Sequence, residues 1–147
     1  MMLTFQGSIR SSRWGPHAIT GDKGSEIIDE LKPGREDYVI EKRRYSGFYE
    51  ADLDLTLREL GVEVLILTGL HTNCCVKHTA ADAYFRGYKI IAPEDATEDL
   101  TKEDHDHGLE EMKKFYKAEV TTTSDVIRDM KAMSFWVVGP KPKKELK

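Results

Sequence analysis

Apolar and polar segments alternate along the chain in a way that predicts strands and helices following one another in turn. Residues 62–68 (Val-Glu-Val-Leu-Ile-Leu-Thr) are the most apolar stretch, and we expect a strand covered on both faces, as in the centre of a parallel sheet. The same reasoning predicts further strands at residues 37–42, 89–92 and 119–122, and helices at residues 24–31, 53–60, 73–86, 103–114 and 124–133. This alternation indicates an α/β fold with a parallel sheet and right-handed crossovers.

Sheets of this kind place their functional site beyond the carboxyl ends of the strands, and two reactive side chains fall there. Lys42 closes the strand at residues 37–42, and Cys75 lies in the first turn of the helix after residues 62–68 and a glycine turn. A helix N-terminus favours the thiolate form of such a cysteine, and its N–H groups can hold an oxyanion. The leading interpretation is therefore acyl transfer at Cys75.

Each of these residues also has an ordinary structural interpretation. A free cysteine is most often a small buried apolar residue, which is how we interpret Cys74, about 100 degrees around the helix from Cys75. A charged cluster at a strand end usually lies in solvent, so Lys42 matters only if its ammonium approaches the thiol. His71 and His78, spaced four residues from Cys75 and Cys74, lie on different helix faces, so these residues do not form a zinc cage.

Length, charge and the number of cysteines exclude some classes of protein. At 147 residues the chain is long enough for one domain with a buried core. A net charge of −4, with acidic and basic residues interspersed, argues against a nucleic-acid partner, and no apolar run is long enough to span a membrane. The two cysteines are adjacent, so we expect no structural disulfide and a cytoplasmic location. His105 and His107, in an acidic run, are interpreted as solvent-exposed.

Three segments carry a resemblance to a known family. Residues 69–83 read Gly-Leu-His-Thr-Asn-Cys-Cys-Val-Lys-His-Thr-Ala-Ala-Asp-Ala, which resembles the nucleophile segment of the isochorismatase-like cysteine hydrolases. These include nicotinamidases, N-carbamoylsarcosine amidases and isochorismatases. In the family pattern the nucleophile directly precedes Val and lies four residues before Thr, which selects Cys75. Residues 39–48 (Val-Ile-Glu-Lys-Arg-Arg-Tyr-Ser-Gly-Phe) are similar to the segment with the catalytic lysine, and residues 14–26 to one with a substrate-stacking Trp and a metal-ligand His.

The resemblance implies a three-layer α/β/α fold with a mostly parallel, Rossmann-like sheet over residues 14–133, followed by a tail at residues 134–147. It also implies a set of site residues: Cys75 and Lys42 in catalysis, the backbone N–H groups of His71 and Cys75 as an oxyanion hole, Trp14 and Phe48 at the substrate, and His17 at a metal. In the family that oxyanion hole relies on a cis peptide bond, here between Leu70 and His71. The implied metal is zinc or another divalent ion in a full-length parent protein.

The N-terminal region departs from the family pattern. The family begins with a strand ending in a general-base aspartate, then a helix, a second strand and an Asp-x-His metal motif. Residues 1–13 contain no aspartate and no histidine. The resemblance therefore implies that the first strand and helix are missing, which leaves an apolar sheet edge and favours a homo-oligomer. Back-translation of residues 1–6 gives an Asp-Ala-His-like motif in another frame. We expect an out-of-frame start, with a divergent but genuine N-terminus as the alternative.

Together these features imply a hydrolase of small amide or carbamoyl substrates, in which Cys75 attacks the carbonyl carbon and water hydrolyses the thioester. Two alternatives stay open: a vinyl-ether hydrolase of the isochorismatase type, for which the cysteine is dispensable, and a catalytically silent fragment that binds a ligand or assembles with partners. Asp82, Asp95 and Asp99 are the aspartates nearest the motif, and we expect none to reach the thiol. We therefore expect little or no amidase activity from this chain.

Overall fold

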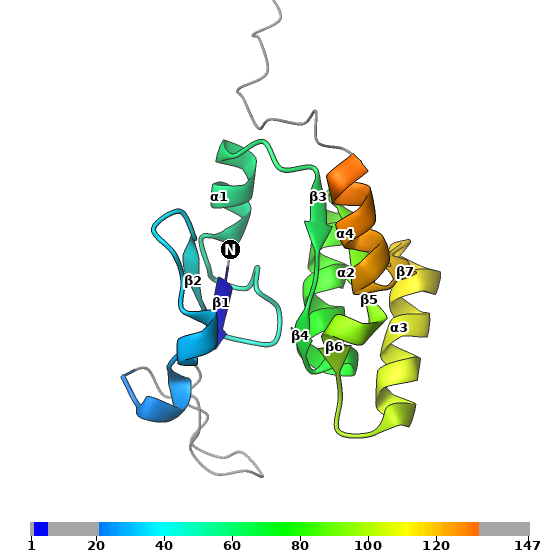
Figure 1. The fold of residues 1–147 in the computed structure, drawn as a ribbon, viewed down its shortest axis with the longest axis horizontal. Coiled ribbons are helices and arrows are strands. Elements are labelled where there is room, and N and C mark those ends of the chain that lie inside the picture. The colour runs from blue at the N-terminus through cyan, green and yellow to red at the C-terminus, as the bar shows by residue number, and fades with distance from the viewer. Residues whose placement is uncertain (1, 6–20, 133–147) are drawn as a thin grey trace, which may run out of the picture.

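The computed structural model describes residues 2–5 and 21–132, and every strand pair in this part of the chain is parallel (Figure 1). The strands form three ladders, β3-β5-β7, β1-β2 and β4-β6. Their bounds are β1 Met2–Phe5, β2 Val39–Lys42, β3 Val64–Ile66, β4 Gly69–Leu70, β5 Lys89–Pro93, β6 Thr97–Glu98 and β7 Glu119–Thr121. Parallel strands separated by helices confirm the expected α/β fold.

Helices lie on both faces of the β3-β5-β7 ladder. In Figure 1, α2 and α3 cover one face and α4 lies on the other, which gives three layers. The helix bounds are α1 Leu53–Glu59, α2 Lys77–Phe85, α3 Lys102–Tyr116 and α4 Thr123–Ala132, with a π-helical turn η3 at Thr72–Val76 and 3₁₀ turns η1 Lys23–Ser25, η2 Asp29–Leu31 and η4 Glu94–Ala96. None of the helices in the described ranges is long and apolar enough to cross a membrane.

The buried core lies between the β3-β5-β7 ladder and helices α2 and α3. Leu65 and Ile90, which are register partners in β3 and β5, are both buried. Helix α2 contributes Ala80 and Ala83, both completely buried, and small side chains at these positions let the helix lie close to the sheet. Met112 of α3, also completely buried, fills the space beside them. This core fixes the end of β3 and the start of α2, between which Cys75 lies.

The predicted helix at residues 24–31 was wrong. The structure has two separate 3₁₀ turns there, η1 and η2, neither of which buries a residue. Ile28 and Leu31 are 60% and 58% exposed. A short helix in water is marginal unless tertiary packing stabilises it, and none of the residues in these two turns is fully buried.

The expectation for residues 62–68 also needs correction. The strand β3 ends at Ile66, and the chain then turns at Gly69, whose φ of 115° favours glycine, to form β4 in a different ladder. Val64 and Ile66 are 44% and 41% exposed, so within the described residues only the face bearing Leu65 is well buried. Hydrophobicity predicted the strand, but it did not predict how many faces its neighbours cover.

Candidate active site

Cys75 lies in a turn that departs from regular α-helical geometry. After β4 the chain has a cis peptide bond between Leu70 and His71, as expected, and then enters η3. The backbone N–H groups of Cys74 and Val76 both donate to the carbonyl oxygen of His71 at 3.1 Å. The cysteine therefore belongs to a π-helical turn that leads into α2, rather than to the first turn of α2 itself.

Lys42 and Cys75 meet at the carboxyl ends of their strands. The Lys42 side chain is buried, with 8% relative exposure, although it belongs to a run of charged residues. Its Nζ donates to the carbonyl oxygen of Arg44 at 2.8 Å and lies 3.8 Å from Sγ of Cys75. The distance agrees with the expected value of about 5 Å or less, although in the described chain β2 pairs with β1 and not with β3 or β4. Burial lowers the pKa of Lys42, and the nearby Cys75 offsets part of that effect.

A buried threonine links the segment after Lys42 to η3, the turn that bears the candidate nucleophile Cys75 and is called the nucleophile turn below. Thr79 Oγ1 donates to the carbonyl oxygen of Cys75 at 2.8 Å and accepts from the N–H of Gly47 at 3.0 Å. Thr79 is 6% exposed, so water competes little for either bond. Ser46, also buried, accepts from the N–H of Phe48 at 3.1 Å and orders the same loop. Sequence reasoning used Thr79 only to number the motif and missed this link.

Cys74 and Cys75 are similarly exposed, but different charged groups surround their sulfur atoms. Both are partly buried, so Cys74 is not the fully buried core residue that we expected. Burial, together with the negative charges of Cys75 and Asp99, raises the pKa of Cys74 to about 11. Cys74 is therefore almost entirely a neutral thiol near pH 7. Cys75 is the cysteine whose sulfur contacts Lys42.

Asp99 contacts the nucleophile turn, which the sequence analysis did not predict. Its Oδ2 accepts from the N–H of Asn73 at 2.7 Å, and its Oδ1 accepts from the N–H of Leu100 at 2.8 Å. Oδ1 also lies 3.3 Å from Nδ1 of His71, without aligned hydrogen-bond geometry. Although burial opposes it, the hydrogen bonds from Asn73 and Leu100 and the proximity of His71 lower the pKa of Asp99. Asp99 thus holds backbone next to Cys75, and its oxygens are already occupied by other donors.

Helix α3 packs directly on the nucleophile turn. A Cβ atom at Gly108 would lie 2.8 Å from both N and Cα of Asn73, so only glycine fits at this crossing. One turn earlier, His105 Nδ1 lies 2.8 Å from Oγ1 of Thr72, whose side chain is completely buried. His105 is thus half-buried against the turn, and its interpretation as a solvent-exposed residue was wrong. The many acidic residues around His105 obscured the apolar face of α3 in the sequence, and this face packs on the turn.

The other predicted site residues fall into two groups. Phe48 is 5% exposed and its ring stacks on Tyr88, with the Arg86 guanidinium 4.8 Å from the ring centroid. Among the described residues this is the packing of a core residue, and a contact of Phe48 with substrate stays a prediction. Trp14 and His17 lie outside the described residues. Among the residues that the structure describes, no three His, Cys, Asp or Glu side chains are grouped to hold a metal ion.

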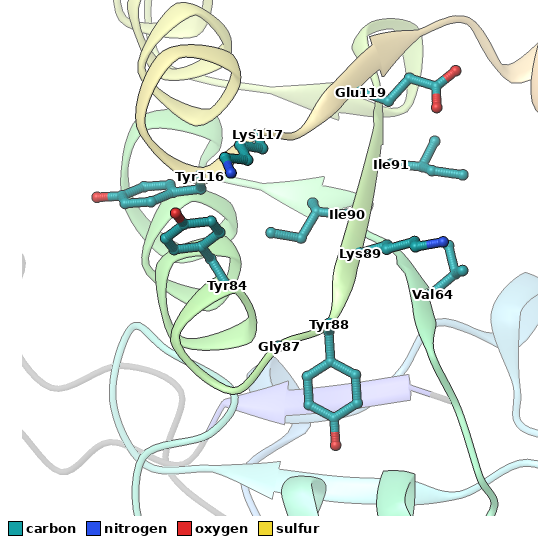
Figure 2. A pocket seen from close by; sticks show the side chains of 10 residues that line it. All are labelled: Val64, Tyr84, Gly87, Tyr88, Lys89, Ile90, Ile91, Tyr116, Lys117 and Glu119. Carbon is teal, nitrogen blue, oxygen red and sulfur yellow. The ribbon is translucent and has the colours of Figure 1, made fainter.

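A pocket of about 450 Å³ lies away from Cys75, at the amino ends of β3, β5 and β7. Figure 2 shows Tyr84 and Tyr116 on the same side of β5 as Ile90, with Lys89 and Ile91 on the other side. None of the residues that line it contacts Lys42 or Cys75 in the hydrogen bonds of the described chain. Parallel sheets carry their catalytic groups at the opposite end, so this pocket is not the candidate active site.

Comparison with known proteins places this chain in a family. The isochorismatase domain model matches residues 3–125. An uncharacterized isochorismatase family protein of Bacillus subtilis, YaaI, is 38% identical over 108 residues, which cover 74% of this chain and 60% of that protein. The ureidoacrylate amidohydrolase RutB of Variovorax paradoxus is 47% identical over 86 residues, covering 58% of this chain and 34% of RutB. The chain therefore spans between one third and about 60% of the length of these relatives.

Solved structures agree with the sequence comparison. An isochorismatase-like hydrolase from Alkaliphilus metalliredigens matches 87% of this chain and 70% of its own, with a TM-score of 0.78 and 39% identity. N-carbamoylsarcosine amidase from Thermoplasma acidophilum matches 82% of this chain and 69% of its own, with a TM-score of 0.73 and 39% identity. A Pyrococcus horikoshii pyrazinamidase solved in complex with zinc is 28% identical, covering 82% of this chain and 73% of its own, with a TM-score of 0.73. In sequence and in fold, the chain belongs to the isochorismatase family.

Proposed function

We propose that this chain carries the nucleophile and lysine of a cysteine hydrolase that cleaves small amide or carbamoyl C–N bonds. The observation that carries the proposal is the 3.8 Å approach of Lys42 Nζ to Cys75 Sγ at the carboxyl ends of parallel strands. Buried Lys42 stabilises a thiolate and the negative charge that develops during attack. Similarity to N-carbamoylsarcosine amidase and ureidoacrylate amidohydrolase supports a C–N substrate class.

In the proposed reaction Cys75 Sγ attacks the carbonyl carbon of the substrate. The carbonyl oxygen takes up the negative charge, and the backbone N–H groups of His71 and Cys75 stabilise it. Collapse of this intermediate breaks the C–N bond, the amine leaves with a proton, and water then hydrolyses the thioester. The N–H groups of Asn73, Cys74 and Val76 already donate to Asp99 and His71, so we propose no role for these three in binding the oxyanion.

Proton transfer needs a group that the described residues do not supply. Within residues 2–5 and 21–132, the side chains shown to interact with the Cys75 thiol are Lys42 and Cys74, and neither is a carboxylate. A general base must lie within hydrogen-bonding distance of the proton it accepts. We therefore keep the expectation that this chain turns amides over slowly. Zinc, a cytoplasmic location and a homo-oligomer remain proposals, and we route no step through a metal.

The test is ammonia release from nicotinamide, N-carbamoylsarcosine and ureidoacrylate. It compares this chain with one extended upstream to the length of its relatives, each with Cys75→Ala and with Cys74→Ala as the matched control. Ammonia release that depends on Cys75 and not on Cys74 supports the proposal. Release that is unchanged in Cys75→Ala contradicts it. Turnover of isochorismate by the Cys75→Ala variant would support the vinyl-ether alternative, and failure of both chains on all substrates would support the silent fragment.

A further inference from the structure

Asp99 occupies an unusual place for a carboxylate that is not itself assigned to the chemistry. Strand β6 pairs with β4 in the register Leu70–Glu98, so the next residue along each strand is His71 on one side and Asp99 on the other. The Asp99 side chain is 8% exposed and points at the turn that bears Cys75. A buried carboxylate is costly unless its oxygens are well bonded. Its hydrogen bonds therefore point to a role in holding the backbone of the turn.

The turn depends on Asp99 for a cap that its own residues do not provide. His71, at the N-cap position of η3, makes no side-chain capping bond. Asp99 replaces that cap from another strand by accepting the N–H of Asn73 at 2.7 Å, while its other oxygen lies 3.3 Å from the His71 ring. One carboxylate thus contacts His71, which carries the first proposed oxyanion donor, and Asn73, two residues before the second donor, Cys75.

We propose that Asp99 is a positioning residue that fixes the oxyanion-binding N–H groups of His71 and Cys75 for attack by the thiolate. The inference rests on the proposed function and extends it to a residue outside the three resembling segments. Oxyanion donors act only if they are held at about 2.7–3.1 Å from the position of the developing charge. A carboxylate anchored by β6 and bonded at two points can hold the backbone to that tolerance, because its own position is set by the Leu100 N–H.

Two reagents separate oxyanion stabilisation from general damage to the site. With p-nitrophenyl acetate, Cys75 Sγ bonds to the acetyl carbon, the carbonyl oxygen becomes an oxyanion, and collapse expels p-nitrophenolate to leave a thioester. With iodoacetamide, the same sulfur displaces iodide and no oxyanion forms. Neither reaction needs the amide turnover that this chain is expected to lack. Both rates are measured on the full chain, with Cys74→Ala as the common background.

The substitution is Asp99→Asn, and its matched control is Asp95→Asn. Asp95 performs similar capping elsewhere, accepting from the N–H and hydroxyl of Thr123 at 2.7 and 2.8 Å. We expect Asp99→Asn to slow acylation at least about tenfold, while the alkylation rate changes by less than about twofold. Asp95→Asn should change neither rate. Asp99→Ala, which removes both acceptor oxygens, should slow acylation at least as much as Asp99→Asn.

The outcomes are distinguishable. Equal losses in both reactions for Asp99→Asn, or no loss in either, would overturn the positioning role. Acylation that persists in Cys75→Ala would instead overturn the proposed function. If the Asp99 variants do not fold, hydrogen exchange on the unsubstituted chain decides: the Asn73 amide must exchange far more slowly than an unstructured peptide, and fast exchange would contradict the cap on which the inference depends.

Discussion

The nucleophile turn and helix α4 are each capped by an aspartate from another segment, yet they differ in how deeply their own residues are buried. Asp99 accepts the N–H of Asn73 in η3, and Asp95 accepts the N–H of Thr123 in α4, both at 2.7 Å. The turn buries Thr72 and Val76, whereas α4 buries none of its residues. A capping bond alone orients the first N–H groups of a helix or turn. Dense packing around the cap, as in η3, also fixes the positions of the neighbouring atoms.

The largest expected effect separates the two cysteines of the turn. Cys75→Ala should reduce acylation by p-nitrophenyl acetate to the background rate, because it removes the nucleophile. Cys74→Ala should leave most of the reaction. In the unsubstituted chain, iodoacetamide should label Cys75 first, since a pKa of about 11 keeps Cys74 protonated at pH 8. Peptide mass spectrometry after partial labelling measures this order, and faster labelling of Cys74 would contradict the assignment.

Gly108→Ala should disturb the packing of α3 on the turn strongly and the structure of α4 little. The added Cβ would lie 2.8 Å from the Asn73 backbone, so α3 or the turn must move, at a cost of about 1–3 kcal/mol in the free energy of unfolding. Gly24→Ala is the matched control, because a Cβ there meets nothing within 4 Å. It should change stability by about 0.5 kcal/mol or less. Urea unfolding and acylation rates measure both; unchanged acylation in Gly108→Ala would show that the crossing tolerates a methyl group.

Thr79→Val should weaken the link between the Lys42 segment and the turn. The substitution keeps the volume but leaves the N–H of Gly47 without its acceptor and removes the bond to the Cys75 carbonyl oxygen. We expect a loss of about 1 kcal/mol in stability, together with slower acylation. Thr79→Ser retains the hydroxyl and should preserve the acylation rate. If the serine variant acylates as slowly as the valine variant, the hydroxyl alone does not sustain the reaction, and the assigned role of its hydrogen bonds is contradicted.

Protonation of Asp99 at acidic pH should weaken the hydrogen bond that caps the turn. Hydrogen bonds lower its pKa in the folded state, so its contribution to stability is complete above the unfolded value of about 3.9 and is lost as pH falls through the folded value. His71 and Cys74 are the titratable groups that face it. Asp99→Asn should therefore reduce the loss of stability between about pH 4 and the lower folded pKa. Parallel unfolding curves for the two proteins across this range would contradict the assignment.

The smallest effect is expected on the surface of α4. Ile127 and Met130 are 45% and 60% exposed, so serine at either position removes little buried apolar area. We expect changes of about 0.5 kcal/mol or less in the free energy of unfolding and no change in acylation. Thermal unfolding of each variant checks this. A loss as large as that of Gly108→Ala would mean that α4 is covered in solution, as in the proposed homo-oligomer.

Much of the fold was predictable because strands and long helices have strong periodic patterns. Helix α3 and strand β5 lie where apolar spacing and their terminating residues placed them. Short segments were less predictable: η1 and η2 replaced a predicted helix, since propensity without burial does not decide the conformation of so few residues. The approach of Lys42 to Cys75 was predictable for a different reason: Lys42 ends one parallel strand, and Cys75 lies in the turn that follows another.

The sequence by itself determined the reactive groups, the order of strands and helices, and the segments that resemble the family. Only the tertiary structure decided which other residues reach the site: Asp99, Gly108 and His105 are brought to the turn by the β4–β6 pairing and by the crossing of α3. It also showed that Phe48 packs in the core against Tyr88. The physical reason is that local patterns encode periodicity and burial, whereas contacts between residues about 26 to 35 positions apart depend on how finished elements pack.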